Sequence, residues 1–307
     1  MSSKTLIAVV GPTAIGKTRL GIDLAKHFQT EIISADSRQF FKEMKIGTAV
    51  PSAEELKAVP HHFIQHKSIF EPYSVGDFEK EAIVLLDTLF KKKDVVVMVG
   101  GSGLYVDAVV KGLDEFPKID PKTRDHLNQK FNEKGLSYLQ EELKSKDPEY
   151  FEIVDTDNPH RLIRALEVCI EANQPYSSFL KQKKKQRAFN SAYVGIHADR
   201  EIIYDRINQR VDLMMEAGLL DEAKELYPNR DLNALQTVGY RELFEYFDGG
   251  ITLDFAVAEI KKNTRRFAKR QLTWLRKNES ILWVEHDTEP TKVLKKVERH
   301  LLHNMDG

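Results

Sequence analysis

Residues 11–18 have the types and spacing of a site that binds a phosphate chain. They match the pattern G-x-x-x-x-G-K-[ST] and read Gly11-Pro12-Thr13-Ala14-Ile15-Gly16-Lys17-Thr18. In such a loop the backbone N–H groups and the following helix N-terminus point at one anion, and the lysine adds positive charge. The Thr18 hydroxyl can ligate Mg²⁺. The alternative is a glycine-rich turn that binds nothing, which would not need Lys17 and Thr18 at the start of the helix.

Asp36 is the second candidate for chemistry. It follows the segment 31–35, which we expect to be a strand. In doubly wound sheets ligands bind at the carboxyl ends of the strands, so we expect Asp36 beside the phosphate loop. It could serve there as a Mg²⁺ ligand or as a general base. The structural alternative is a helix N-cap.

Arg206 and Arg210 form a third candidate. They lie four residues apart on a predicted helix and therefore share one face. Paired arginines following a strand suit phosphate binding. Ion pairing at the surface with Asp205 or Asp212 remains open as the alternative.

Two basic stretches could attract nucleic acid. The predicted helix 253–276 carries Lys261, Lys262, Arg265, Arg266, Lys269, Arg270 and Arg276, with Phe267 and Trp274 between them. Lysine and arginine along one helix are typical of a phosphate-backbone contact. The second stretch, residues 181–187, fits a solvated loop equally well.

The elements that must position these residues alternate between strand and helix. We expect strands at 6–10, 31–35, 94–99, 192–197 and 281–284, and a short one at 61–64. We expect helices at 17–28, 73–90, 199–216 and 253–276, one opened by 235–241, and a last one ending near 303. This order predicts an α/β fold, a P-loop NTPase-like parallel sheet flanked by helices. The strand at 94–99 ends in Gly100-Gly101, where many P-loop enzymes carry an aspartate.

Residues 115–190 differ from the rest. They are charged and show helical patterns at 121–134, 137–144 and 161–171, with no clear strand. We therefore expect a catalytic core of residues 1–114 and 191–307, interrupted by an inserted helical subdomain of residues 115–190.

Composition restricts the partners. The 307 residues carry a formal net charge of −1, so any attraction for nucleic acid must come from a local cluster. The single cysteine, Cys169, excludes an internal disulfide and a cysteine-based zinc site. No apolar run approaches the ~20 residues of a membrane span, and we expect a cytoplasmic protein without a membrane partner.

Further blocks of the sequence resemble the tRNA isopentenyltransferase family, the bacterial tRNA dimethylallyltransferases. The blocks lie at residues 33–39, 47–49, 100–105, 161–168, 238–241 and 268–276, so the resemblance covers nearly the whole chain. The chain departs from the family pattern at Ser102, which stands in place of threonine, at His160 in place of glutamine, and at Val211 in place of phenylalanine.

The resemblance implies a reaction. It implies transfer of a dimethylallyl group from dimethylallyl diphosphate to N6 of adenosine 37, in tRNAs that read codons beginning with U, with release of pyrophosphate. The expected catalytic residues are Asp36 as the base, and Lys17, Thr18 with Mg²⁺, and Arg210 at the diphosphate. ATP hydrolysis is not required, although the loop is of the nucleotide-binding and ATP-binding type.

The resemblance also implies a tRNA-binding surface and a monomer that grips the anticodon stem-loop. The expected contacts are Asp36, Ser37, Arg38, Gln39, Ser102, Arg124, His160, Arg161, Arg164, Gly239, Arg241, Lys269, Arg270 and Arg276.

Two other functions remain open on the residues alone. A P-loop kinase for a nucleotide or small metabolite would consume ATP but leaves block 268–276 unexplained. A P-loop protein that binds RNA without catalysis leaves Asp36 without a chemical task.

Overall fold

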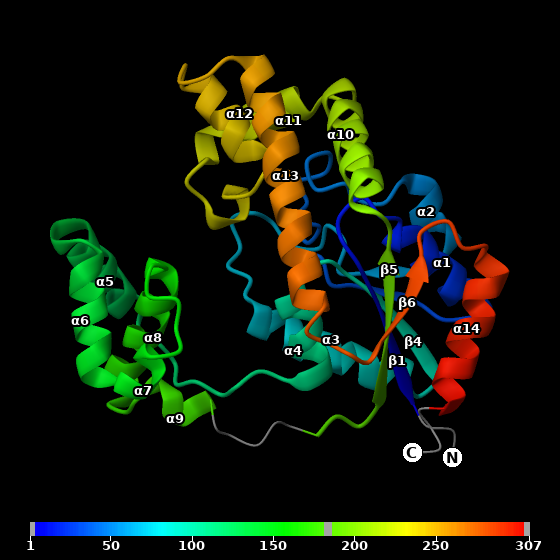
Figure 1. Ribbon diagram of the computed structural model, residues 1–307, viewed down its shortest axis with the longest axis horizontal. Helices are drawn as coiled ribbons and strands as arrows, with labels where there is room; N and C mark the ends of the chain where they lie inside the picture. The colour runs from blue at the N-terminus through cyan, green and yellow to red at the C-terminus, as the bar shows by residue number, and fades with distance from the viewer. Residues whose placement is uncertain (1–3, 181–185, 304–307) are drawn as a thin grey trace. The chain divides into compact units, whose positions relative to one another are not determined.

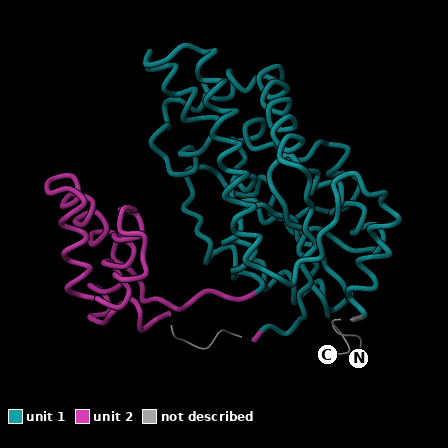
Figure 2. The backbone as a smooth tube through the Cα atoms, viewed as in Figure 1, with its two compact units in different colours: residues 1–110, 187–307 teal, residues 111–186 magenta. Residues whose placement is uncertain are grey.

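The computed structural model describes residues 4–180 and 186–303. It divides into two compact units, residues 1–110 with 187–307 and residues 111–186 (Figure 2). Of the basic stretch at 181–187, residues 181–185 lie outside the described residues. No helix in the described parts of the chain has the length and apolar character needed to cross a membrane.

Six parallel strands form one sheet in the described part of the first unit, in the order β3-β2-β4-β1-β5-β6 (Figure 1). The strands are β1 Thr5–Val10, β2 Ile32–Ser34, β3 His61–His62, β4 Val95–Val99, β5 Asn190–His197 and β6 Ile281–Glu285. Every residue of β1 is buried, as expected for an inner parallel strand covered on both faces. The predicted parallel α/β fold is confirmed.

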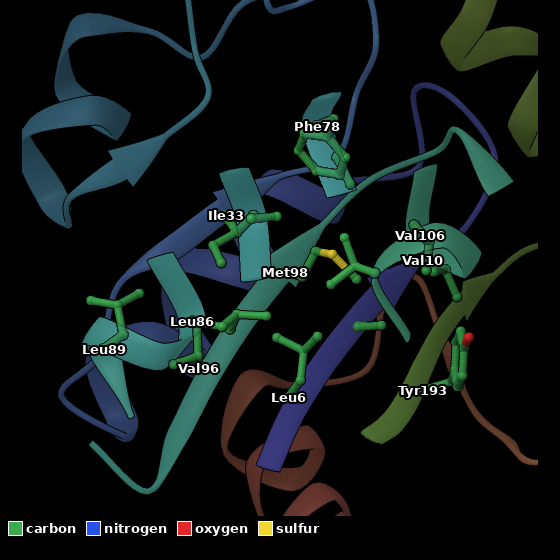
Figure 3. Close-up of a cluster of buried hydrophobic side chains, with 14 of the residues drawn as sticks. Leu6, Val10, Ile33, Phe78, Leu86, Leu89, Val96, Met98, Val106 and Tyr193 are labelled. Carbon is green, nitrogen blue, oxygen red and sulfur yellow. The ribbon is translucent and has the colours of Figure 1, made fainter. Parts of the chain in front are cut away.

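Alternate residues of β1 supply two different cores. Leu6, Ala8 and Val10 face one side, where they pack with residues of α3 (Val75–Leu89) and α4 (Gly103–Lys111) (Figure 3). Ile7 and Val9 face the other side, against α1 (Lys17–His27), α14 (Pro290–His303) and the start of α10 (Arg200–Glu216). The sheet is therefore held rigidly between helices, which fixes the positions of its strand ends.

The helices of this unit are α1 Lys17–His27, α2 Ala53–Ala58, α3 Val75–Leu89, α4 Gly103–Lys111, α10 Arg200–Glu216, α11 Leu219–Leu226, α12 Tyr240–Phe247, α13 Leu253–Leu275 and α14 Pro290–His303, with short 3₁₀ turns at Tyr227–Asn229 and Asn233–Leu235. The helices predicted at 17–28, 73–90, 199–216 and 253–276, and the one predicted to end near 303, lie within two residues of those bounds. Helices α10 to α13 enclose a third core, built around Val211, Leu219, Tyr240 and Ile260. Helices α10 and α13 pack side by side around this core (Figure 1).

The prediction that residues 235–241 open one helix is wrong. A 3₁₀ turn ends at Leu235, and α12 begins only at Tyr240. Gly239, with φ 101°, interrupts the helical path, and its N–H donates to Glu242 Oε2 at 2.8 Å. Residues 236–239 are thereby left outside any helix and can line a cleft.

The second unit contains helices joined by loops, and no strand among its described residues. It contains α5 Pro121–Lys134, α6 Leu136–Lys146, α7 Pro148–Phe151, α8 Pro159–Ala172 and α9 Tyr176–Leu180. Leu127, Leu139, Leu143, Leu162 and Leu166 form its own core. Asp147 caps α7 and also accepts from the Ser177 N–H at 2.7 Å, which ties α9 to the bundle.

Candidate active site

The phosphate loop joins β1 to α1 in a conformation that opens its backbone toward one cleft. Gly16 occupies the N-cap of α1 with φ 105°, and Ala14 also has a positive φ of 66°. A Cβ at Gly11 would lie 2.9 Å from the Ile196 carbonyl oxygen, so this position requires glycine. Lys17 Nζ donates to the Pro12 carbonyl at 2.7 Å and is thereby held over the loop.

Gln271 of α13 connects the loop to the turn after β4. The Thr13 N–H donates to Gln271 Oε1 at 2.9 Å, and Gln271 Nε2 donates to the Gly101 carbonyl at 2.9 Å. The side chain is only 7% exposed. A Cβ at Gly101 would lie 2.4 Å from Gln271 Nε2, so the glycine leaves room for this bridge.

Asp36 follows β2 and lies immediately before a turn of residues 37–40, where no helix begins. Its Oδ1 accepts from the Arg38 N–H at 3.2 Å. The Ser37 and Ser102 hydroxyls lie 3.3 Å apart, which links this turn to the segment after β4. Asp36 thus makes a local turn contact, but it does not serve as the helix N-cap that was the structural alternative.

Two further predicted RNA contacts help to fix the same turn. Arg38 Nη1 donates to the Ala234 carbonyl at 2.8 Å. Gln39 Nε2 donates to the Ala49 carbonyl at 2.9 Å. Glu222 of α11 accepts from the N–H groups of the adjoining segment 45–47 and from the Tyr240 hydroxyl.

A cleft of ≈ 860 Å³ brings the four expected catalytic side chains together: Lys17, Thr18, Asp36 and Arg210 all line it. The other predicted residues that line it are Thr13, Ala14, Ile15, Gly16, Ser37, Arg38, Gln39, Ser102, Gly239, Arg241 and Arg270. Gly11 and Pro12 are buried, while Lys269 and Arg276 are exposed on and just after α13.

The cleft is electrostatically prepared for an anion. Burial lowers the pKa of Lys17 to about 8, although the charge of Asp36 acts in the opposite direction and that of Arg210 adds to the decrease. Burial also lowers the pKa of Arg210, which the charge of Asp36 again opposes. Burial disfavours the charged forms of Lys17 and Arg210, and a nearby negative charge favours them. A multiply charged anion that binds beside these two cations therefore stabilises their charged forms more than the single carboxylate of Asp36 can.

Arg206 and Arg210 do different things although they share a helix. Arg206 Nη1 donates to the Ile15 carbonyl at 3.2 Å and so supports the phosphate loop from outside the cleft. The alternative partner Asp212 is paired instead with Lys261 at 2.5 Å. Of the two arginines, only Arg210 is available to a ligand in the cleft.

The basic residues of α13 also fall into two groups, those with a partner within the protein and those that are exposed. Lys261 pairs with Asp212, Lys262 with Glu259 at 2.7 Å, and Arg265 donates to Asn208 Oδ1 at 2.7 Å. Lys269 and Arg276, by contrast, are exposed and have no ionic partner among the described residues. The Arg270 guanidinium lies over the Phe267 ring, 5.7 Å from its centroid.

In the second unit, Arg124 and Arg164 share a buried partner. Glu167 is fully buried, and its carboxylate accepts from Arg124 at 2.7 Å and from Arg164 at 2.6 Å. Both arginines remain partly exposed beyond this pairing. His160 and Arg161 are exposed at the start of α8.

Sequence reasoning missed the contribution of α13 to the cleft. Thr264, Phe267, Gln271 and Trp274 line it together. Their spacing of three, four and three residues puts them on one helical face. That periodicity was visible in the sequence and could have identified the face, although it could not show what the face covers.

A phosphate loop after an inner parallel strand, with a cationic cleft at the carboxyl ends of the strands, defines a P-loop α/β protein. The family model described as IPP transferase matches residues 39–278, and the chain belongs to this family.

Named relatives match over almost their full length. A tRNA dimethylallyltransferase of Christiangramia forsetii is 62% identical, over 96% of this chain and 98% of the relative. One of Flavobacterium johnsoniae is 59% identical, over 97% and 98%. The crystal structure of a tRNA isopentenylpyrophosphate transferase from Bacillus halodurans superposes with a TM-score of 0.73 at 37% identity, covering 99% of this chain and 97% of that one.

Proposed function

We propose that the protein transfers the dimethylallyl group of dimethylallyl diphosphate to N6 of adenosine 37, in tRNAs that read codons beginning with U, and releases pyrophosphate. The observation that carries this is the convergence of Lys17, Thr18, Asp36 and Arg210 on one cleft. The names of the relatives support the choice of both substrates. Because the acceptor is tRNA, the protein would act in the cytoplasm. We further propose that it acts as a monomer.

The diphosphate binds at the loop. Its oxygens accept from the backbone N–H groups at the start of α1, and Lys17 and Arg210 supply positive charge. As the bond from the allylic carbon to oxygen breaks, negative charge builds up on the departing pyrophosphate. Fixed cations in a sheltered cleft stabilise that charge more than they stabilise the bound substrate, and this difference accelerates the reaction.

Asp36 acts on the acceptor. The lone pair of the adenine amine is delocalised into the ring, so N6 is a weak nucleophile until its proton leaves. A carboxylate at the end of β2, facing the same cleft as the diphosphate site, is placed to accept that proton during attack. The adenine must first leave the base stack of the anticodon loop to enter the cleft.

Mg²⁺ fits the donors that line the loop. The described residues contain no group of three or more His, Cys, Asp or Glu side chains that could hold a metal ion. Mg²⁺ at phosphate sites commonly takes only one or two protein oxygens, together with substrate oxygens and water. The Thr18 hydroxyl is the protein ligand that the loop offers, and the ion would neutralise charge on the diphosphate.

The RNA would be held chiefly through its phosphates and its shape. In the first unit, Arg241 and Arg270 line the cleft, whereas Lys269 on α13 and Arg276 just after it are exposed and without an ionic partner in the described part of the chain. Ser37, Arg38, Gln39, Ser102 and Gly239 would contact the loop nucleotides near the adenine.

We assign tRNA binding to the inserted helical subdomain, residues 115–190, as well. Arg124, His160, Arg161 and Arg164 present basic groups on its surface. Because Glu167 already neutralises part of the charge of Arg124 and Arg164, we expect their contribution to RNA affinity to be smaller than that of Arg161.

Incubation of the purified protein with unmodified tRNA, dimethylallyl diphosphate and Mg²⁺ tests this function. We expect a mass gain of one dimethylallyl group on adenosine 37, together with release of pyrophosphate. A parallel incubation with ATP and no prenyl donor controls for phosphoryl transfer. ATP consumption without any gain of mass on the tRNA would refute the proposal.

A further inference from the structure

The apolar side chains that line the cleft form two groups with different exposure. Leu104 and Phe267 are 60% and 38% exposed. Val211, Leu219 and Ile260 are at most 2% exposed and belong to the third core. A flexible aliphatic chain that lies against the sheltered group is shielded from water on that side, and the gain grows with the apolar area of the chain that is removed from water.

The sheltered group lies directly beside the charged end of the cleft. Ile207, Arg210, Val211 and Met214 are spaced by three, one and three residues, and all four line the cleft from one face of α10. Arg210 and Met214 are one helical turn apart, about 6 Å along the axis. A diphosphate at Arg210 therefore has an aliphatic surface within roughly the reach of a five-carbon chain.

Met214 differs from its apolar neighbours in its freedom to move. Val211, Leu219 and Ile260 are locked in the core, whereas Met214 is half-buried and packs against that core from the cleft side. Methionine is unbranched, with three rotatable bonds, and fills irregular space well. Met214 is therefore the residue on this wall whose side chain can fill or leave free the space beside the sheltered group.

We propose that Met214 determines the length of the prenyl chain that the enzyme accepts, by closing the sheltered apolar part of the cleft beyond five carbons. This inference rests on the proposed function and names a residue that selects the donor. Truncation of Met214 would admit the ten-carbon allylic diphosphate, geranyl diphosphate.

The chemistry with the longer donor is unchanged. The bond between the allylic carbon and oxygen breaks, and its electron pair leaves with pyrophosphate. The same carbon bonds to N6, and the N6 proton passes to Asp36. No additional reactant is needed.

The test compares donors in Met214→Ala and in the unaltered protein. We expect the ratio of kcat/KM for geranyl over dimethylallyl diphosphate to rise at least about 10-fold, since methylene-sized differences in apolar pockets discriminate by this amount or more. Leu213→Ala is the matched control, because Leu213 precedes Met214 on the same helix but is 63% exposed and outside the cleft. The control should leave the ratio unchanged.

Inhibition by pyrophosphate separates the selecting role from a structural one. Met214→Ala should leave the inhibition constant of pyrophosphate unchanged while lowering that of geranyl diphosphate. The bulkier Met214→Phe should lower kcat/KM for dimethylallyl diphosphate, again with unchanged pyrophosphate inhibition. These results would support the inference.

Two outcomes would overturn it, and they are distinguishable. If the unaltered protein transfers the five-carbon group but Met214→Ala shows the same donor ratio, the inference fails and the proposed function stands. If the unaltered protein transfers no prenyl group to tRNA, the proposed function fails and the inference fails with it.

Discussion

The hydrogen-bonded bridge from Gln271 to Gly101 allows us to predict how strongly substitutions at these two positions are coupled in their effect on stability. A methyl group at position 101 would lie 2.4 Å from Gln271 Nε2, whereas the nearest atom outside Gln271, Lys17 Nζ, would lie 3.5 Å away. Gly101→Ala must therefore displace the Gln271 amide. This would break its hydrogen bonds with the Gly101 carbonyl and the Thr13 N–H. Gln271→Ala removes the same two bonds directly.

The size of the effect follows from those two bonds. Each is worth a net ~0.5–1.5 kcal/mol, so each single substitution should lower the free energy of unfolding by about 1–3 kcal/mol. In the double variant the clash disappears, because no Gln271 amide remains to be displaced. Gly101→Ala should then cost almost nothing further, which gives a coupling free energy of about 1–3 kcal/mol between the sites.

Urea denaturation of the four proteins followed by circular dichroism measures this coupling. Because the chain has two units, pyrophosphate affinity provides a second readout that reports on the loop alone. Both single variants should lose affinity through the Thr13 N–H, and the double variant should lose no more than Gln271→Ala. Additive losses, to within ~0.5 kcal/mol, would refute the bridge as the reason for glycine at position 101.

Three further predictions concern the cationic groups and the metal. The pKa of Lys17 is lowered to about 8, and only the charged form of its side chain attracts diphosphate, so the affinity for the donor should fall as the pH rises through this value. Calorimetric titrations of Lys17→Arg at several pH values should show no such fall near pH 8. A fall that persists in this variant would assign the titration to another group. Thr18→Ala should raise the Mg²⁺ concentration needed for half-maximal transfer, with recovery in Thr18→Ser, and an unchanged Mg²⁺ titration would remove Thr18 as a ligand. Lys269→Gln and Arg276→Gln should each reduce the slope of log tRNA affinity against log salt concentration by about 0.7–0.9. Lys261→Gln should leave this slope unchanged, because the Lys261 ammonium is already paired with Asp212. Equal slopes in all three variants would show that Lys269 and Arg276 do not contact RNA phosphates.

The features that depend on local sequence could be predicted. The loop at Gly16-Lys17-Thr18 and the position of Asp36 follow from a strand, a turn and a helix in immediate succession. The sheet itself follows from the alternation of apolar runs with helical patterns. The carboxyl ends of parallel strands meet at one edge, which is why Lys17 and Asp36 could be expected in one cleft before the structure was known.

The partners of long side chains could not be predicted. Arg206 was expected at a phosphate or an acidic neighbour, and it donates to the carbonyl of Ile15 instead. Gln271 acquires its role from a contact across 258 residues, which no local pattern encodes. Arg124 and Arg164 were expected to contact tRNA, but their common buried partner Glu167 depends on how α5 packs against α8.

The start of α12 at Tyr240 could also not be predicted from the local pattern. Residues 235–241 carry enough helix-forming residues to suggest a continuous helix. The positive φ of Gly239 and the buried carboxylate of Glu242, which accepts its N–H, decide otherwise. The consequence is functional, because residues 236–239, which lie outside any helix, line the cleft.

Single-turnover transfer by Asp36→Asn tests the central claim most directly. Asparagine retains an oxygen that can accept from the Arg38 N–H, so the turn is preserved while the proton acceptor is lost. We predict a rate reduced by ~10²–10⁴ at saturating dimethylallyl diphosphate, with the tRNA Kd unchanged. A folded Asp36→Asn protein that modifies adenosine 37 at the rate of the unaltered enzyme would contradict the account.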